Sequence, residues 1–246
     1  NRVLIKFSYR FGKSKIFSMP KMLNLDPTNL CDLKCPLCPT GLRDKTVERG
    51  SIKLDQFKIV LNRLGKHLQS VNLYSWGEPL LHKSLIDMIR YSAINHKIRT
   101  ITSVHLGNLT DEQVEGLVTS KLDKLIVSID GATQEVYEKY RVGGDIEKVL
   151  RNMERLVEAK KSHNSKLNIV WNFLVMKQNE HQMDLAKKRA KEIGVDITFS
   201  IMRTNLKEDI LGKVEDNIEN DAEWIPKNPE FNPYDLKQKK RKNPIK

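Results

Sequence analysis

Short β-rich runs alternate with longer stretches of helical periodicity along most of this chain, and this alternation limits the fold more than any other feature. The β-rich runs predict strands over residues 22–27, 70–75, 98–104, 124–130, 166–176 and 196–202. Between them, the periodicity predicts helices near residues 54–68, 81–96, 110–120, 146–163 and 180–193. Such alternation is typical of parallel βα units joined by right-handed crossovers. We therefore predict an α/β protein.

Signals at the helix ends support these assignments. Thr110 is a suitable N-cap, and Asp111 and Glu112 follow it where the helix dipole favours acidic side chains. Gly194 is a natural C-cap for the helix over 180–193. The clearest amphipathic helix, over 146–163, has one apolar stripe, formed by Ile146, Val149, Leu150, Met153, Leu156 and Val157. Two architectures suit the pattern, an open doubly wound sheet and a barrel, and periodicity alone does not separate them.

The regular pattern ends near residue 202. Pro226, Pro229, Pro233 and Pro244 interrupt a polar, lysine-rich segment that is typical of a linker or tail. We expect three parts: a basic N-terminal segment over residues 1–21, one core domain over 22–205, and a linker or tail over 206–246. A chain of 246 residues is long enough for one large domain with a substantial buried core.

The net charge of +12 is concentrated at the two ends of the chain. Residues 1–21 hold six basic and no acidic side chains, and residues 226–246 hold seven basic and two acidic ones. A nucleic-acid-binding protein would show a basic face on its folded body, so this distribution argues against that class. Like-charge runs are usually solvated tails. Weak attraction of the ends to RNA or to an anionic membrane surface is the alternative.

The composition also limits the location of the protein. No apolar run approaches the roughly 20 residues that a membrane helix needs. The first 21 residues are too interrupted by Lys and Arg to be a secretory signal. The three cysteines lie within eight residues of one another, which points to metal chemistry in a reducing compartment and not to disulfides. We expect a cytoplasmic protein without a membrane span.

Cys31, Cys35 and Cys38 have the spacing Cys-x3-Cys-x2-Cys in a segment that also contains Pro36 and Pro39. The prolines oppose a buried helical stripe of cysteines and favour a loop. Structural zinc and electron-transfer sites normally use four protein ligands, whereas three thiolates leave one metal position open for reaction. A zinc site completed by His82 or His105 is the main alternative, followed by inert cysteines.

The cysteine loop resembles the signature of the radical S-adenosylmethionine (radical SAM) superfamily, with Leu37 where the family usually has an aromatic residue. The resemblance covers roughly residues 22–202 and implies a partial (β/α)6, TIM-like barrel with its cofactors at the C-terminal strand ends. In that family, three thiolates and SAM together coordinate a 4Fe-4S cluster. One-electron reduction then cleaves SAM to methionine and a 5′-deoxyadenosyl radical, which abstracts hydrogen from the substrate.

A second resemblance lies after the second predicted strand. Gly77, Glu78 and Pro79 resemble the family's Gly-Gly-Glu-Pro segment, with Trp76 in place of the first glycine. In the family this segment meets the amino group of SAM through backbone carbonyls and the glutamate. Without the resemblance, Gly-Glu-Pro is a weak signal that also fits a simple turn before a helix.

The resemblance also implies which further residues contact SAM. The run 125–131 with the following Tyr137, Tyr140 and Arg141 resembles the fourth strand and following helix of the family's SPASM-extended branch. This implies that Ser128 lies near the ribose or carboxylate of SAM and that Arg141 pairs with the carboxylate, although both could be ordinary packing or surface residues. Ser103 stands where the family often has a Thr-Asn-Gly segment that contacts the ribose, so that contact departs from the pattern. No motif marks a catalytic residue.

The resemblance also implies partners and a longer parent protein. The first residue is asparagine and not methionine, which indicates an incomplete chain. The segment 224–234 resembles the linker before the SPASM extension, so we expect a C-terminal domain with auxiliary clusters beyond this sequence. The family's reductants are proteins such as flavodoxin or ferredoxin. The expected activity is that of a radical SAM enzyme, an oxidoreductase in type, on a peptide or small molecule that the sequence does not identify. The alternative is a non-catalytic metal-binding or scaffold protein with a degenerate radical SAM fold.

Overall fold

The computed structural model describes residues 10–11, 18–43, 45–202, 222–232, 234–235 and 240–241. Most of the basic segment over 1–21 and all of 206–221 lie outside these residues, as do most of the lysines near the C-terminal end. The expectations for solvated, basic ends therefore concern parts of the chain that the structure does not describe.

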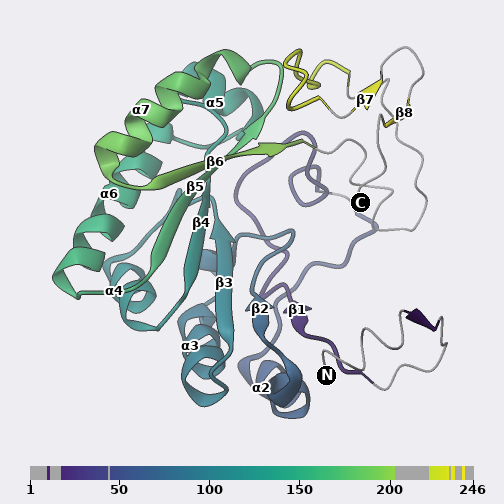
Figure 1. The fold of residues 1–246 in the computed structure, drawn as a ribbon, viewed down its shortest axis with the longest axis vertical. Helices are drawn as coiled ribbons and strands as arrows, with labels where there is room; N and C mark the ends of the chain where they lie inside the picture. Colours follow the sequence, from purple (N-terminus) through teal and green to yellow (C-terminus); the bar gives the residue numbers. More distant parts are fainter. Residues whose placement is uncertain are drawn as a thin grey trace.

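Six parallel strands form the sheet, in the sequence order β1-β2-β3-β4-β5-β6 (Figure 1). They are β1 (Met22–Asn24), β2 (Ser70–Asn72), β3 (Arg99–Val104), β4 (Lys124–Ser128), β5 (Asn168–Val175) and β6 (Asp196–Ile201). A doubly wound sheet reverses its strand order at a switch point, and this sheet has no reversal. The order is that of a barrel, and β1 and β6 remain the two open edges, as expected for a partial (β/α)6 barrel.

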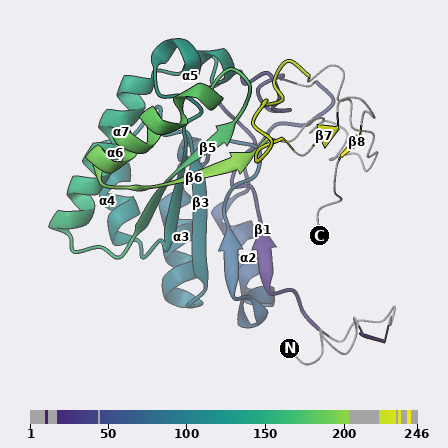
Figure 2. The same ribbon diagram turned by 45° about the horizontal axis from the view of Figure 1, so that its top comes forward.

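The helices cover the convex face of the curved sheet (Figures 1 and 2). They are α2 (Leu54–Leu64), α3 (Leu85–Arg90), α4 (Asp111–Thr119), α5 (Gln134–Tyr140), α6 (Ile146–Ser162) and α7 (Met183–Ile193). Short helical turns extend them: η1 (Gly65–His67), η2 (Pro79–Leu81), η3 (Tyr91–Asn95) and η4 (Glu180–Gln182). The main core lies between helices and sheet, where strand residues such as Val71, Leu125 and Trp171 are fully buried. Among the described residues, no helix has the length and apolar character needed to cross a membrane.

The helix-end predictions are confirmed. Thr110 Oγ1 accepts the Gln113 N–H at 3.2 Å, and Gln113 Oε1 accepts the Thr110 N–H at 3.1 Å, which is a reciprocal capping box. Gly194 ends α7 with φ +86°, a left-handed conformation that favours glycine.

One predicted helix, over 81–96, is wrong as a continuous element. The chain forms η2, turns at residues 82–84, and then continues as α3 and the π-helical turn η3. Ser92 Oγ donates to Met88 O at 2.8 Å, and this back-bond to the preceding turn is a recognised cause of helix distortion.

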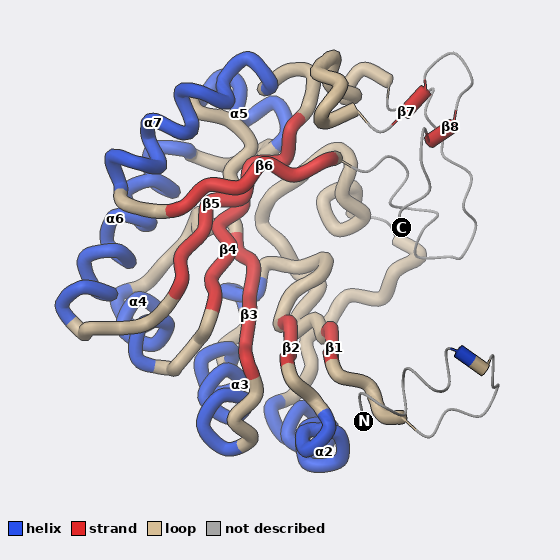
Figure 3. Tube along the Cα trace, viewed as in Figure 1, coloured by secondary structure: helices blue, strands red, loops and turns tan. Residues whose placement is uncertain are grey.

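The concave face of the sheet is the more polar one. Strand residues paired in register share a face, and Ser128 pairs with Asn172, while Ser103 pairs with Ile126. Asn172 Oδ1 accepts hydrogen bonds from Ser200 Oγ and Thr198 Oγ1. The tube drawing shows that the loops after the strands gather at one edge of this face (Figure 3).

Residues 222–232 pack against the body of the domain. The Lys177 N–H donates to Trp224 O at 2.9 Å, and the Asn228 N–H donates to the Glu180 carboxylate at 2.9 Å. Phe231 is buried against Phe199 of β6. Farther along, β7 (Tyr234–Asp235) pairs antiparallel with β8 (Lys240–Arg241).

Candidate functional site

The three cysteines line one cavity at the C-terminal end of the strands. Cys35 is buried, Cys31 and Cys38 are half-buried, and all three are free thiols. The same cavity is lined by the residues expected to contact SAM: Gly77, Glu78, Ser103, Ser128 and Arg141. Pro79 follows Glu78 directly and begins η2. The structure therefore brings together residues that are up to 110 positions apart in the sequence.

The cysteine segment is a loop, as its prolines predict. The Cys38 N–H donates to Cys35 O at 3.2 Å, and the Leu42 N–H donates to Cys38 O at 2.8 Å. Gly41 lies so close to this turn that a Cβ there would be 2.4 Å from Cys35 O. Only glycine fits at that distance without movement of the backbone. Sequence reasoning missed Gly41, because nothing in the motif itself marks the residue that folds back onto it.

Without a bound metal ion, the buried thiol of Cys35 stays protonated. Burial raises its pKa to about 12, and the nearby Arg141 charge opposes the rise only in part. Thiolates are the metal-binding form of cysteine, so a bound metal would replace this proton.

Gly77 and Glu78 are fixed by close backbone contacts. A Cβ on Gly77 would lie 1.9 Å from Thr28 O, so the chain here requires glycine. Glu78 is 3% exposed; its Oε1 accepts the Leu80 N–H at 3.2 Å and its Oε2 accepts the His105 N–H at 2.7 Å. The pKa of Glu78 is raised, because burial outweighs the opposing effects of His105 and of these two N–H groups. The carboxylate is a fixed acceptor at the cavity wall.

Trp76, the departure from the family pattern, lies at a boundary. Its backbone N–H donates to the Asp26 carboxylate at 3.1 Å. Trp76 lines both the cysteine cavity and a neighbouring cavity, which is also lined by Asp26 and Arg49.

Two hydroxyl groups mark the strand side of the cavity. Ser103 on β3 and Ser128 on β4 lie with their Oγ atoms 3.2 Å apart on the concave face. They form a hydroxyl pair that can both donate and accept hydrogen bonds.

Arg141 is held by a buried ion pair. Its Nε donates to Asp130 Oδ2 at 2.6 Å, and Asp130, which is fully buried, also accepts the Leu174 N–H at 2.7 Å. The pKa of Asp130 is raised, because burial outweighs the opposing effect of Arg141. Asp130 orients the guanidinium of Arg141. Within the described chain, the two terminal nitrogens of Arg141 have no hydrogen-bond partner and can bind an anion in the cavity.

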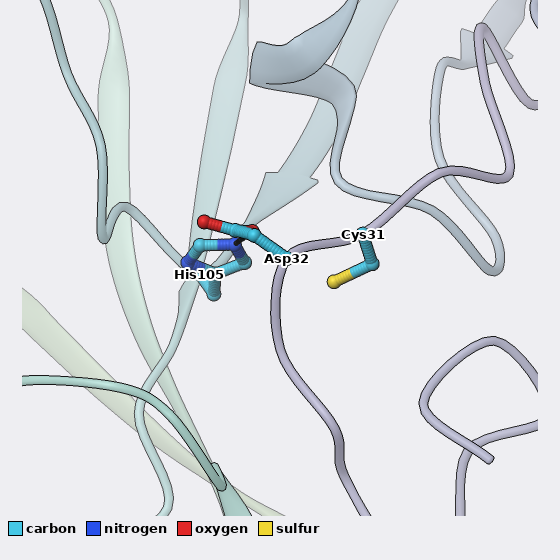
Figure 4. A group of neighbouring side chains, drawn as sticks. All are labelled: Cys31, Asp32 and His105. Carbon is cyan, nitrogen blue, oxygen red and sulfur yellow. Dashed lines mark hydrogen bonds and ion pairs between the residues drawn. The ribbon is translucent and has the colours of Figure 1, made fainter. Parts of the chain in front are cut away.

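His105, which follows β3, is the site residue that no motif marks. Its ring is 5% exposed, and its Nε2 lies 2.7 Å from Asp32 Oδ1 and 3.3 Å from Glu78 Oε2. One ring nitrogen of His105, a carboxylate oxygen of Asp32 and Cys31 Sγ all lie within 4.8 Å of one another (Figure 4). The signal available in the sequence was position, because His105 follows a parallel strand directly, as the Gly-Glu-Pro segment does.

The protonation of His105 follows from its partners. Burial by itself lowers the pKa of His105, but the nearby Glu78, Asp32 and Cys31 outweigh it and raise the pKa to about 10. The Gly107 N–H points at Nδ1 at 2.9 Å. In either charge state of the ring, Nε2 carries a proton and donates it to Asp32. This hydrogen bond is the main reason why the pKa of Asp32 is lowered.

The side chains near the cysteines distinguish between a zinc site and an iron–sulfur cluster. Of the two histidines expected to complete a zinc site, only His105 lies beside a cysteine; His82 Nε2 is bound to Ile52 O, and its Nδ1 accepts the Ser84 N–H. Cys35 and Cys38 are not part of the group that Cys31 forms with Asp32 and His105. Three thiols on one cavity, with acceptors and a guanidinium on its other walls, fit a cluster with an open iron position better than a closed zinc site.

A group of aromatic and apolar side chains, called the cover below, packs over Cys35 beside the cavity. Tyr140 and Trp224 meet edge to face, with ring centroids 5.7 Å apart. A small apolar cluster joins them to the cysteines: Leu33, Cys35, Met176, Met202 and Ile225 are buried there, and Cys31, Leu37, Cys38 and Leu174 are partly buried. The cover thus includes residues from the segment over 222–232.

The sequence profile of the radical SAM superfamily matches residues 25–188. The chain belongs to the radical SAM superfamily. Among its radical SAM relatives is an AdoMet-dependent heme synthase of Methanosarcina barkeri, 27% identical over 176 residues, which are 71% of this chain and 48% of that protein. Another is a GTP 3′,8-cyclase of Desulforamulus reducens, 24% identical over 72% of this chain and 54% of that protein.

Solved structures share this fold. SuiB of Streptococcus suis, solved with bound S-adenosylmethionine, superposes with a TM-score of 0.65 at 18% identity, over 81% of this chain and 44% of that one. The chain spans about half the length of the curated relatives it matches.

Proposed function

We propose that this chain is the core of a radical SAM enzyme, with a 4Fe-4S cluster on Cys31, Cys35 and Cys38. The observation that carries the proposal is that the three thiols share one cavity with Gly77, Glu78, Ser103, Ser128 and Arg141. Bound there, a reduced cluster and SAM would supply a 5′-deoxyadenosyl radical that abstracts hydrogen from a substrate.

The residues around the cavity would hold SAM by complementary chemistry. The Glu78 carboxylate and the backbone carbonyl of Gly77 would accept hydrogen bonds from the amino group, with Pro79 fixing the turn beside them. Arg141, oriented by Asp130, would pair with the carboxylate. The hydroxyls of Ser103 and Ser128 would bond the ribose. The cover formed by Tyr140 and Trp224 would exclude water.

The partners follow from the same proposal. An electron donor such as flavodoxin or ferredoxin would reduce the cluster. The substrate would be a peptide or a small molecule; the superfamily relatives include enzymes named for heme synthesis, GTP cyclisation and PqqA peptide cyclisation. An oxidative outcome is the one we propose. The core domain would extend over 22–205, with linker or tail character over 206–246.

The test is anaerobic. The protein is reconstituted with iron and sulfide, reduced with dithionite and incubated with SAM, and 5′-deoxyadenosine is measured by liquid chromatography. We expect 5′-deoxyadenosine from the wild-type chain and none from Cys35→Ala. Visible absorption provides the first checkpoint, because an iron–sulfur protein is brown and a zinc protein is colourless.

One observation favours a second candidate, a non-catalytic metal-binding protein. The group of Cys31, Asp32 and His105 could hold a metal ion by itself. A colourless protein that binds stoichiometric zinc through these residues, and forms no cluster, would establish this alternative and refute the first one.

A further inference from the structure

His105 connects the cysteine loop to the loop after β3. Its Nε2 bonds Asp32 Oδ1 at 2.7 Å, and Asp32 is the residue after Cys31. The second carboxylate oxygen of Asp32 accepts Asn108 Nδ2 at 2.8 Å, from the same loop after β3. Both bonds join positions more than 70 residues apart. The beginning of the cysteine loop is therefore tied to the loop after β3 through the Asp32 side chain.

The orientation of the His105 ring is determined from three sides. The Gly107 N–H donates to Nδ1 at 2.9 Å, and Nε2–H donates to Asp32. Glu78 Oε2 lies 3.3 Å from Nε2 on a third side. A buried ring with these contacts has one orientation and one tautomer. The His105 backbone N–H also donates to Glu78 Oε2 at 2.7 Å. One residue thus contacts both the loop that carries Cys31 and the carboxylate proposed to bind SAM.

Cys31 is held on both flanks. Before it, the Leu30 carbonyl accepts the Glu78 N–H at 2.8 Å. After it, Asp32 depends on the side-chain bonds to His105 and Asn108. Cys35 is 5% exposed and packs in the apolar cluster, and the Cys38 N–H bonds back to Cys35 O. Cys31 is half-buried and is followed by the exposed Asp32. An exposed residue keeps a fixed position only when specific bonds hold it.

We propose that His105 is a positioning residue, which holds Cys31 in place for metal binding by fixing Asp32 against the loop after β3. This inference rests on the proposed function for its consequence, the retention of iron. Hydrogen-bonded partners of metal-ligand segments typically change metal affinity or activity by 10- to 100-fold when they are removed. His105 acts through Asp32 and does not need to touch SAM or substrate.

The test compares four variants with the reconstituted wild-type protein. His105→Leu removes both ring bonds at similar volume, His105→Gln keeps an N–H near the position of Nε2, and Asp32→Ala removes the acceptor. His82→Leu is the matched control, because His82 is also a buried, doubly bonded histidine but is bound to Ile52 and Ser84, away from the cysteines. Thermal unfolding checks that each variant folds. If His105→Leu does not fold, Asp32→Ala still tests the proposal, because Asp32 is exposed and its replacement is tolerated more easily.

The first measurement is iron loss to a ferrous chelator, followed by absorbance. We expect loss at least about 10-fold faster for His105→Leu and Asp32→Ala than for wild type, with rescue in His105→Gln and no change in His82→Leu. The EPR spectrum of the reduced cluster should change in His105→Leu and return toward wild type in His105→Gln. Iron loss and EPR spectra that are the same in His105→Leu and His82→Leu would overturn the proposal.

The second measurement uses the metal-free protein and separates this inference from the proposed function. Cys31 and Cys38 are alkylated with iodoacetamide under native conditions, and the rates are read by peptide mass spectrometry. We expect faster alkylation of Cys31 relative to Cys38 in His105→Leu and Asp32→Ala, because the Cys31 loop is released. If the wild-type chain holds no iron, the proposed function fails and this ratio alone decides; an unchanged ratio overturns the positioning role.

Discussion

The cavity has two anchors that are built in opposite ways. On the side of β4 and β5, Arg141 is fixed by Asp130, which is fully buried and bonded to the Leu174 backbone. On the side of β1, Cys31 is fixed through Asp32, whose side chain is 36% exposed. A desolvated ion pair is strongly coupled to folding, whereas a pair with one partly exposed member is coupled to it less strongly. One side of the cavity therefore depends on a buried pair, and the other on a bond between the buried His105 and a partly exposed carboxylate.

The strands differ in the same sense. β4 and β5 pair over five residues in register, from Lys124 with Asn168 to Ser128 with Asn172. β1 and β2 have three residues each, and the connection after β1 is held by side-chain bonds within itself, such as Thr28 Oγ1 to Gly50 O at 2.9 Å. We infer that the β1 side can adjust its loops at a small cost in free energy, while the β5 side cannot.

Truncating the two carboxylates is the strongest way to break this comparison. Asp130→Ala leaves the Arg141 charge buried without its partner, and we expect the free energy of unfolding to fall by about 3–5 kcal/mol. Asp32→Ala, the matched change on the other side, should lower it by about 1 kcal/mol or less. Urea unfolding followed by circular dichroism measures both. Equal losses would show that the two anchors do not differ in kind.

A smaller effect is expected from Gly77→Ala on the β1 side. The new Cβ would lie 1.9 Å from Thr28 O, so the backbone must move, and overpacking of this kind costs about 1–3 kcal/mol. Gly50→Ala is the control, because a Cβ there meets nothing within 4 Å, and it should stay within about 0.5 kcal/mol of wild type. Hydrogen exchange of residues 27–33 should quicken in Gly77→Ala alone. Unchanged exchange in this segment would mean that the loop is not held by the close approach at Gly77.

The sequence predicted most of the fold and the chemistry of the site, and its failures have physical causes. The periodicity located all six strands, and Thr110 and Gly194 marked helix ends, because these signals are local. The helix over 81–96 was predicted too long, since the turn at His82 and the back-bond of Ser92 depend on neighbours in space. The choice between barrel and doubly wound sheet required strand order, which periodicity does not contain.

The site shows the same limit. The sequence identified the cysteines by their spacing and Gly77 by its resemblance to the family motif. The reason why glycine is required there is the close approach to Thr28, which is 49 residues away in the sequence. From the sequence, His105 was one of two candidate zinc ligands, beside His82. Its hydrogen-bond partner Asp32 is 73 residues away in the sequence. The order and register of the strands bring these distant loops together, so the hydrogen bonds between the loops cannot be predicted from a local sequence pattern.

The cover over Cys35 offers a third test, between the two anchors. Trp224→Ala removes the edge-to-face contact with Tyr140, and aromatic pairs of this geometry contribute about 0.5–1.5 kcal/mol beyond the area they bury. We expect a loss in this range and faster alkylation of Cys35, whose thiol is otherwise buried. Trp224→Phe should retain most of the protection. If Cys35 reacts at the wild-type rate in Trp224→Ala, the segment over 222–232 does not shield it.

The smallest effect is expected at the N-terminus of α4, where the capping bond involves neither of the two anchors. Thr110→Ala removes the capping bond to the Gln113 N–H, and loss of such a cap typically lowers the free energy of unfolding by about 1 kcal/mol. This loss is close to the one expected for Asp32→Ala, but its location differs. Iron retention and the Cys31-to-Cys38 alkylation ratio should therefore remain at wild-type values in Thr110→Ala. If they change as they do in Asp32→Ala, then general destabilisation, and not the bond to His105, controls the position of Cys31.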